Sequence, residues 1–389
     1  MFTLRPAYGE DFVDREELLA EMVEALSSPR ERMGFALVGR RRMGKTSVFL
    51  EVVRRLDENP RVIPVYLSLW DLVEGTLGEL AQSLVRETLE RFQERGRLPL
   101  AVRARNLLSA PLDLLREVLD GVRISVRLRR EIEILLLFSR GEERPSAADF
   151  LERAVLFPEN LARETGVRCV LFLDEFPTLM EVKHAGQALG EGAVRKLRTL
   201  YERIEHTVFS ISGSMRGTME AVALSPAAAF WRQFVVREVG PLPKPAVDTL
   251  LSRNLGQRVP AEALEALWEL THGIPFYVQF LGRELARLGG KVTAEAVAQA
   301  GEEFLREEGD LLLREEWTHL APKERKVALA LAQGHSAPTA IAQAVGDTPN
   351  VVSRYLLYLE KKGLAERSGR GDWVLTDPVL ARWLARQGL

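Results

Sequence analysis

A ten-residue stretch, "VGRRRMGKTS" at residues 38–47, constrains the fold of this chain more than any other part of its sequence. Residues 34–38, "GFALV", form a short apolar run typical of a buried strand, and residues 47–56, "SVFLEVVRRL", carry apolar groups at helical spacing. A loop of the pattern Gly-x-x-x-x-Gly-Lys-Ser/Thr between a strand and a helix wraps phosphate groups with its backbone N–H groups. The stretch therefore predicts an α/β fold that holds a phosphorylated ligand.

Each part of this loop has an expected role. Lys45 would reach the β and γ phosphate oxygens, the Thr46 hydroxyl would ligate Mg²⁺, and the helix N-terminus would add a favourable field. The three arginines form either a solvated face of the loop, which is the default interpretation, or contacts with phosphate or an acidic neighbour. We expect the whole loop to line the site: Gly39, Arg40, Arg41, Arg42, Met43, Gly44, Lys45, Thr46 and Ser47.

Two carboxylates follow a second apolar run, "VRCVLFLDEFPTLM" at residues 167–180. Asp174 and Glu175 would stand at the C-terminal end of a central strand, the edge where open parallel sheets hold ligands. Asp174 would then hold Mg²⁺ through its water shell beside Thr46, and Glu175 would orient or deprotonate an attacking water. The structural alternative is that the pair only ends the strand and caps the next helix.

A third strand is predicted at residues 206–217, "HTVFSISGSMRG". Ser212 and Ser214 at its end could hydrogen-bond the γ-phosphate or the water, although serines there are also common turn formers. Downstream lie candidates for an arginine that stabilises transition-state charge on a neighbouring subunit's nucleotide, and of these Arg232 joins the candidate catalytic residues. The set is Arg216, Arg232 and Arg237.

Composition excludes several classes of protein. With 46% hydrophobic and 28% charged residues the chain has the composition of an ordinary globular protein, long enough for two or three domains. No uncharged apolar run reaches membrane length and the first residues lack the apolar core of a signal peptide, so we expect a cytoplasmic protein without membrane contact. The single Cys169 allows neither a disulfide nor a cysteine metal site within one chain. Because the net charge is −2, nucleic-acid binding would require a local patch.

The first predicted domain comprises residues 1–240, where strands and helices alternate as in a parallel sheet with helices on both faces. Asp14 and Glu17 match a capping box that would open a helix. A second strand is expected at residues 61–70 and an amphipathic helix over most of 71–92. Within an insert at 93–150, residues 122–138 fit either a hairpin or a strand leading into a buried helix.

Two further domains are predicted: a helical domain at 241–318 and a winged helix-turn-helix at 319–389. In the winged helix, Val352, Leu356 and Leu359 would pack inside. Polar residues of its third helix would face a DNA major groove, and two arginines would lie on the wing near phosphates. These candidate DNA contacts are Asn350, Ser353, Arg354, Lys361, Arg367 and Arg370. Winged helices also dock proteins, so that alternative stays open.

Taken together, "FVDRE", "GRRRMGKTS", "LFLDEF", "SISGS" and "HGIPFYVQFLGREL" resemble the archaeal ATPase family of AAA+-related P-loop proteins, kin to STAND signalling ATPases and origin-recognition initiators. The resemblance covers nearly the whole chain. It implies that the segment of Phe12, Val13 and Arg15 lies by the adenine and that Pro275 opens a lid helix against the nucleotide. The triple arginine belongs to the family's usual phosphate loop. The lid helix departs from the family, because it has no arginine before Arg283.

Two functions follow from these expectations. The first is a switch that binds and hydrolyses Mg-ATP to ADP and contacts double-stranded DNA through the winged helix. The second is a STAND-like signalling ATPase with slow hydrolysis, whose winged helix meets a protein partner. Assembly into a homo-oligomer is compatible with either, whereas a helicase motor is disfavoured because the sequence contains no second motor fold.

Overall fold

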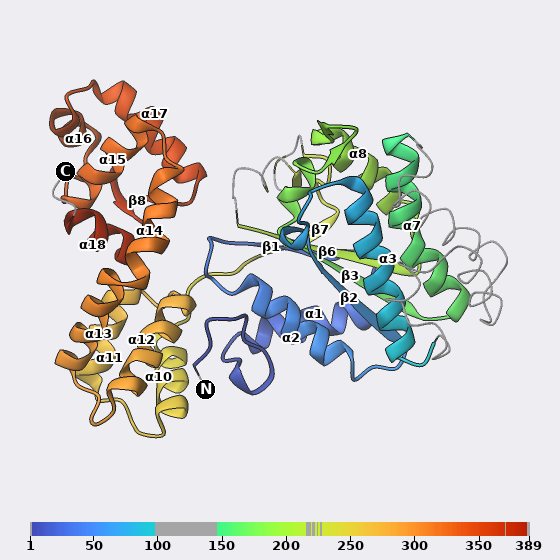
Figure 1. Ribbon diagram of the computed structural model, residues 1–389, viewed down its shortest axis with the longest axis horizontal. Helices are drawn as coiled ribbons and strands as arrows, with labels where there is room; N and C mark the ends of the chain where they lie inside the picture. Colours follow the sequence, from blue (N-terminus) through green and yellow to red (C-terminus); the bar gives the residue numbers. More distant parts are fainter. Residues whose placement is uncertain are drawn as a thin grey trace.

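The computed structural model describes residues 2–97, 146–214, 228–369 and 371–386, together with residues 219, 222, 223 and 225. The interpretation of residues 122–138 lies outside the described residues, as do Arg216 and Arg370. Figure 1 shows an α/β unit joined to a mainly helical C-terminal region. In the described part of the chain, no helix is both long and apolar enough to cross a membrane.

A five-stranded parallel sheet forms the centre of the α/β unit. Its strands lie in the order β2-β3-β6-β1-β7, and every neighbouring pair is parallel. The bounds are β1 Gly34–Val38, β2 Val62–Ser68, β3 Arg168–Asp174, β6 Thr207–Gly213 and β7 Phe234–Glu238. Every residue of β3 and β6 is buried, which explains why these strands are continuous apolar runs. The predicted parallel sheet is confirmed.

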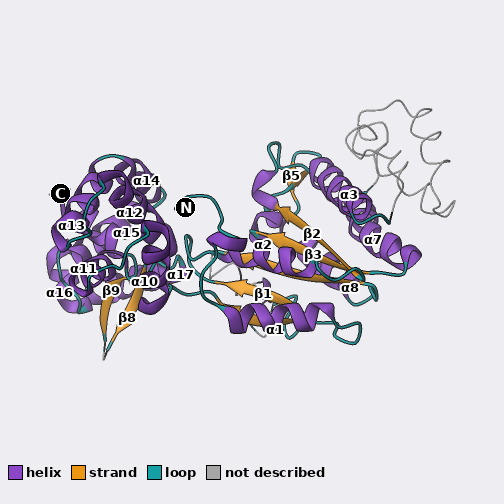
Figure 2. Ribbon diagram, turned by 90° about the horizontal axis from the view of Figure 1, so that it is seen from below, coloured by secondary structure: helices purple, strands orange, loops and turns teal. Residues whose placement is uncertain are grey.

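Helices cover both faces of the sheet, as predicted (Figure 2). One hydrophobic core joins α1 (Glu16–Ser27) and α2 (Lys45–Leu56) to Leu37 and Phe172 of the strands. The other joins α3 (Leu77–Glu94), α7 (Ala147–Thr165) and α8 (Gly190–Tyr201) to Ala36 and Leu171. Successive strand residues thus enter opposite cores, because side chains of a strand alternate between its two faces.

Two helix starts differ from the sequence prediction. The residue before α1 is Arg15, which like Asp14 has a positive φ and caps nothing with its side chain, so the predicted capping box is wrong. Helix α3 begins at Leu77 and not at Asp71, because the Thr76 hydroxyl accepts a hydrogen bond from the Glu79 backbone N–H. The spacing of Thr76 and Glu79 is a start signal that could have been found in the sequence.

The C-terminal region has two parts. The helical unit comprises α10 Lys244–Leu255, α11 Ala261–Thr271, α12 Pro275–Leu288, α13 Ala294–Arg306 and α14 Glu308–Thr318. The C-terminal unit comprises α15 Pro322–Ala332, α16 Pro338–Val345, α17 Pro349–Lys361, the antiparallel pair β8 Ala365–Ser368 and β9 Asp372–Leu375, and α18 Pro378–Arg386. Three helices followed by a two-stranded hairpin is the order of elements that the sequence predicts for this unit.

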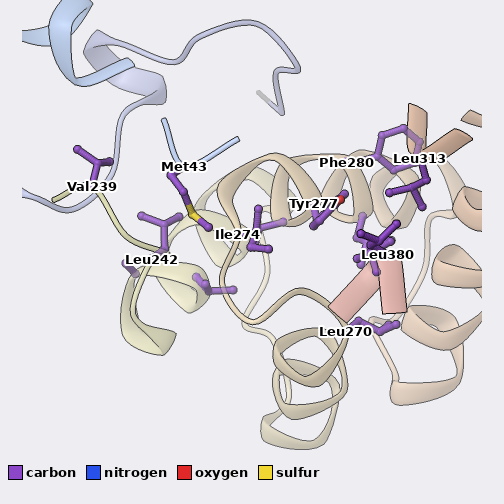
Figure 3. Close-up of a cluster of buried hydrophobic side chains, with 14 of the residues drawn as sticks. Met43, Val239, Leu242, Leu270, Ile274, Tyr277, Phe280, Leu313 and Leu380 are labelled. Atoms are coloured by element: carbon purple, nitrogen blue, oxygen red, sulfur yellow. The ribbon is translucent and has the colours of Figure 1, made fainter. Parts of the chain in front are cut away.

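The core on the α1–α2 face continues into both C-terminal parts. Met43, from the phosphate loop, is 2% exposed and belongs to the same apolar cluster as Ile274 and Tyr277 of the helical unit and Leu380 of the C-terminal unit. Figure 3 shows Met43, Ile274, Tyr277 and Leu380 among the side chains of this cluster. The loop that is expected to bind phosphate is therefore packed against the rest of the chain.

We predict that Gly34→Ala will destabilise the protein by about 3 kcal/mol, since a methyl group there would lie 1.5 Å from the carbonyl oxygen of Phe209 in the sheet. The free energy of unfolding in urea measures the loss. Gly192→Ala in α8 is the matched control, because a methyl group there meets no atom within 4 Å. Equal stabilities of the two variants would contradict the close packing of β1 against β6.

Candidate nucleotide site

The phosphate loop connects β1 to α2 and depends on two glycines. Gly39 has a φ of 152° and comes so close to the Val239 backbone that a Cβ would lie 2.4 Å from its carbonyl oxygen. Gly44 has a φ of 85° at the start of α2. Lys45 is buried, and its ammonium donates hydrogen bonds to the carbonyls of Gly39 at 2.9 Å and Arg40 at 3.0 Å. Burial lowers the pKa of Lys45, and the loop encloses its cation.

Asp174 is fully buried and is held by hydroxyl groups from three elements. Its Oδ2 accepts hydrogen bonds from Thr46 Oγ1 of α2 at 2.6 Å and from Tyr66 OH of β2 at 2.8 Å. Its Oδ1 accepts one from Ser212 Oγ at the end of β6. The predicted pair of Thr46 and Asp174 therefore lies in direct contact, and Asp174 is oriented by its neighbours.

Tyr66 was missed by the sequence analysis. Burial, and then the charge of Asp174, raise the pKa of its hydroxyl, so it stays a neutral donor. The available signal was its position near the C-terminal end of a predicted strand, which places it at the same sheet edge as Asp174.

Glu175 follows β3 with a φ of 50°, a left-handed conformation that costs energy for a residue with a side chain. Its Oε2 accepts hydrogen bonds from the Ser214 backbone N–H at 3.3 Å and from Ser214 Oγ at 3.1 Å. Each predicted serine hydroxyl therefore contacts one of the two carboxylates, Ser212 that of Asp174 and Ser214 that of Glu175. Glu175 lines a cavity of about 340 Å³ together with Lys45, Thr46 and Pro275.

A second, smaller cavity of about 40 Å³ lies beside the first, with Gly44, Ser47 and Pro275 lining both. Its other walls include Met43 of the loop and Phe12, Val13 and Arg15, which belong to the segment that the family resemblance assigns to adenine.

Arg15 is a cation in the lining of this smaller cavity. Its Nη2 donates to the carbonyls of Met43 and Gly240, both at 2.8 Å, whereas its buried Nη1 has no hydrogen-bond partner among the residues that the structure describes. Burial lowers the pKa of Arg15 to about 10. A buried donor without a partner is costly, so Nη1 is a candidate donor to a polar ligand atom.

The arginine run contacts the C-terminal parts of the chain. Arg40 Nη1 donates to the carbonyl oxygen of Thr376 at 2.6 Å. Arg42 Nη1 donates to Tyr277 OH at 2.8 Å, and its Nη2 lies 3.0 Å from the carboxylate of Glu316 in α14. Arg42 is only 14% exposed, so the solvated-face interpretation is wrong for this residue and the acidic-neighbour interpretation is confirmed.

Asp377, the residue before α18, completes this cluster. It accepts a hydrogen bond from Tyr277 OH at 2.6 Å and lies 3.6 Å from Arg42 Nη1. Burial disfavours the Arg42 cation, but Tyr277, Glu316 and Asp377 outweigh it and the pKa of Arg42 is raised. Arg41 alone of the three is exposed, with its guanidinium carbon 5.0 Å from the centre of the Trp70 ring.

Arg232, Arg237 and Arg283 are not among the residues that line the large cavity. Arg232 has a φ of 60° and lies over the ring of Trp231. Arg237 is paired with Glu21 of α1 in the same chain. Arg283 lies 3.0 Å from Glu308, at the start of α14.

The predicted core of α17 is confirmed, since Val352, Leu356 and Leu359 are buried. Of the candidate DNA contacts that the structure describes, Ser353 is half-buried and the others are exposed: Asn350, Arg354, Lys361 and Arg367. The exposed face of α17 also carries two large apolar side chains, Leu357 at 41% and Tyr358 at 43% exposure.

We predict that Arg42→Met will lower the free energy of unfolding by about 3 kcal/mol, because Glu316 loses its cation while it stays largely buried. Arg41→Met, at the exposed neighbour, should change it by less than about 1 kcal/mol. Burial raises the pKa of Glu316, whereas the charge of Arg42 lowers it. Without Arg42, the Glu316 carboxyl group therefore binds its proton more tightly in the folded state than in the unfolded state. Stability of Arg42→Met should therefore fall as the pH rises above the ordinary glutamate value of 4.5.

Adding Glu316→Gln to Arg42→Met should restore part of the stability and remove its dependence on pH, as followed by urea unfolding between pH 4 and 8. A double variant no more stable than Arg42→Met would show that the ion pair is not the cause of the loss.

Comparison with known proteins identifies the fold. No protein-family model and no curated protein matches the chain. A solved Walker-type ATPase of Pyrococcus abyssi is 22% identical, with a TM-score of 0.67 over 98% of this chain and 99% of that one. The ORC2 protein of Aeropyrum pernix, solved in ADPNP–ADP complexes, is 14% identical, with a TM-score of 0.55 over 99% of this chain and 97% of that one. The chain therefore has the fold of the archaeal P-loop ATPases that its sequence resembles.

Proposed function

We propose that the protein is a Mg-ATP-binding and hydrolysing switch, that α10 to α14 form its lid, and that α15 to α18 form a winged helix that binds double-stranded DNA. The observation that carries the proposal is that the phosphate loop itself contacts the C-terminal unit. Arg40 reaches Thr376 and Arg42 reaches the cluster of Tyr277 and Asp377. A change of charge at the loop therefore acts directly on the unit proposed to bind DNA.

The residues present fit ATP and Mg²⁺. Thr46 Oγ1 and the Asp174 carboxylate meet at 2.6 Å, the pair of oxygen donors that a P-loop uses toward Mg²⁺. The buried Nη1 of Arg15 offers a hydrogen bond to a nucleotide in the adjoining cavity. When bound, Mg²⁺ would neutralise charge on the phosphates. Thr46 and Asp174 would hold it, and Lys45 would bind phosphate oxygens.

Glu175 and the two serines would prepare the attacking water. Glu175 lines the same cavity as Lys45, and a carboxylate there can accept a proton from water. Ser214 holds its carboxylate and Ser212 holds Asp174, so both acids are kept in place. In a homo-oligomer, the exposed Arg232 is the candidate for a cation supplied to the neighbouring subunit's nucleotide.

The coupling has an electrostatic basis. Arg42 lines the large cavity and also binds Glu316 and Asp377. With phosphates at the loop, the Arg42 guanidinium would interact with the phosphates as well as with these carboxylates. Its interaction with Glu316 and Asp377 would then be weaker. A ligand shifts such an equilibrium only by as much as it binds the two arrangements differently, and this shared cation supplies the difference.

A second candidate is the STAND-like signalling ATPase with a protein partner. Leu357 and Tyr358, exposed on the outer face of α17, favour it, because exposed apolar side chains on a helix face are typical of protein contacts. Salt dependence separates the two candidates, since phosphate contacts weaken steeply as salt rises.

We expect Lys45→Ala to abolish tight binding of Mg-ATP, since the Lys45 ammonium is the cation enclosed by the loop. We expect Glu175→Gln to keep the binding of Mg-ATP but to lower turnover by about 10²-fold or more. Calorimetry measures the affinity and phosphate release measures the turnover. Wild-type affinity in the lysine variant would contradict the phosphate site, and undiminished turnover in Glu175→Gln would require another base.

For DNA, we predict that replacing Arg354 and Arg367 by alanine will weaken duplex binding and reduce the slope of log affinity against log salt by up to about two. Fluorescence anisotropy with a mixed duplex pool, with and without a slowly hydrolysed ATP analogue, measures both. Replacing the exposed Arg30 and Arg61 of the α/β unit removes the same charge elsewhere and is the control. If the wild-type protein does not bind the duplex either with or without the ATP analogue, the signalling candidate is favoured.

A further inference from the structure

The first residues of the described chain cross the large cavity. We call residues 2–7 the N-terminal strap. Five of them, 3–7, line the same cavity as Lys45 and Glu175. Neither the phosphate-loop pattern nor the family resemblance, which begins at Phe12, assigns them a role. Their contacts are specific at both ends.

At one end the strap is anchored on α12. The Phe2 ring lies against Gly282. If residue 282 had a Cβ, its three nearest atoms would all belong to the Phe2 ring, the closest at 2.1 Å. The Thr3 backbone N–H donates to Gln279 Oε1 at 3.1 Å. Glycine in the interior of α12 costs helix stability relative to alanine, and here its missing side chain makes room for Phe2.

At the other end the strap is anchored on α2, the helix of the phosphate loop. The Ala7 backbone N–H donates to Ser47 Oγ at 3.0 Å. Just beyond it, the Gly9 N–H donates to the buried carboxylate of Glu51 at 2.7 Å. The strap therefore spans from the helical unit to the helix that carries Lys45 and Thr46, across the space between them.

Two residues of this arrangement lie where the two cavities adjoin. Ala7 and Gln279 line both the large cavity and the smaller one that contains Arg15. Arg5, an exposed residue, lines the large cavity and adds a further cation to the lining that includes Lys45. A ligand that extends from Lys45 to Arg15 would thus pass beneath the strap.

We propose that the N-terminal strap is a third wall of the nucleotide site: Arg5 adds to the affinity for the phosphates, and the docking of Phe2 and Thr3 on α12 slows nucleotide release. The inference rests on the proposed binding of ATP. Release would require the strap to lift from α12 or α2, so the strap acts on the dissociation rate, as lids over ligand sites do.

Gly282→Ala tests the docking, because its methyl group displaces Phe2 while alanine favours the helix. We expect dissociation of a fluorescent ATP analogue, chased with ATP in a stopped-flow instrument, to accelerate at least about fivefold. Phe2→Ala should accelerate it similarly, and the double variant no further, because both changes remove one contact. Gly192→Ala in α8, where a methyl group meets nothing, should leave the rate unchanged.

Arg5→Gln tests the cation, with the exposed Arg30→Gln as the control for loss of charge alone. The strap variant should weaken ATP binding at least about threefold more than the control does, and the difference should shrink at high salt. If the wild-type protein binds ATP and the ATP analogue dissociates from Gly282→Ala and Phe2→Ala at the wild-type rate, the proposed role of the strap is wrong but the proposed ATP binding is not. Wild-type protein without any ATP affinity would overturn the strap and the proposed function together.

Discussion

Parallel pairing of β1, β3 and β6 is the constraint on which the rest of the structure depends. In a parallel sheet the C-terminal ends of neighbouring strands meet at one edge. The register pairs Val38 with Gly213 and Ser68 with Asp174, so the phosphate loop, the two carboxylates and the serines emerge side by side. The loop lies more than a hundred positions from the carboxylates and the serines in the chain, and the sheet brings them together. Both faces of the sheet are covered by helices.

A buried carboxylate then determines the geometry of that edge. Asp174 cannot stay charged in the interior without hydrogen bonds, since an unpaired buried charge is costly. Thr46, Tyr66 and Ser212 supply them from three different elements. Each hydroxyl thereby loses its freedom to rotate, and the acid is oriented without any ligand. The proposed Mg²⁺ site is thus preorganised by the need to satisfy one carboxylate.

The same argument, with the sign of charge reversed, explains the arginine run. Arg42 is enclosed between the phosphate loop and the C-terminal parts, so its cation requires acidic partners there, and Glu316 and Asp377 provide them. Met43 beside it extends the hydrophobic core into the helical unit. If the loop binds phosphate as proposed, it cannot respond to a ligand without affecting the two other units against which it packs. This shared position is the physical basis for treating the chain as a switch.

Features that depend on local pattern could be predicted from the sequence. The strand, loop and helix around Lys45, the strand that ends at Asp174, and the buried face of Val352, Leu356 and Leu359 follow from the periodicity of apolar residues and from glycines that permit a tight loop. Tertiary structure alone decided the partners of Arg40 and Arg42, the contact of Tyr66 with Asp174, and the placement of residues 2–7 across the cavity. Some of these contacts join residues more than three hundred positions apart, as Arg40 and Thr376 are. The sequence alone does not show whether a charged or hydroxyl side chain contacts water or a buried partner.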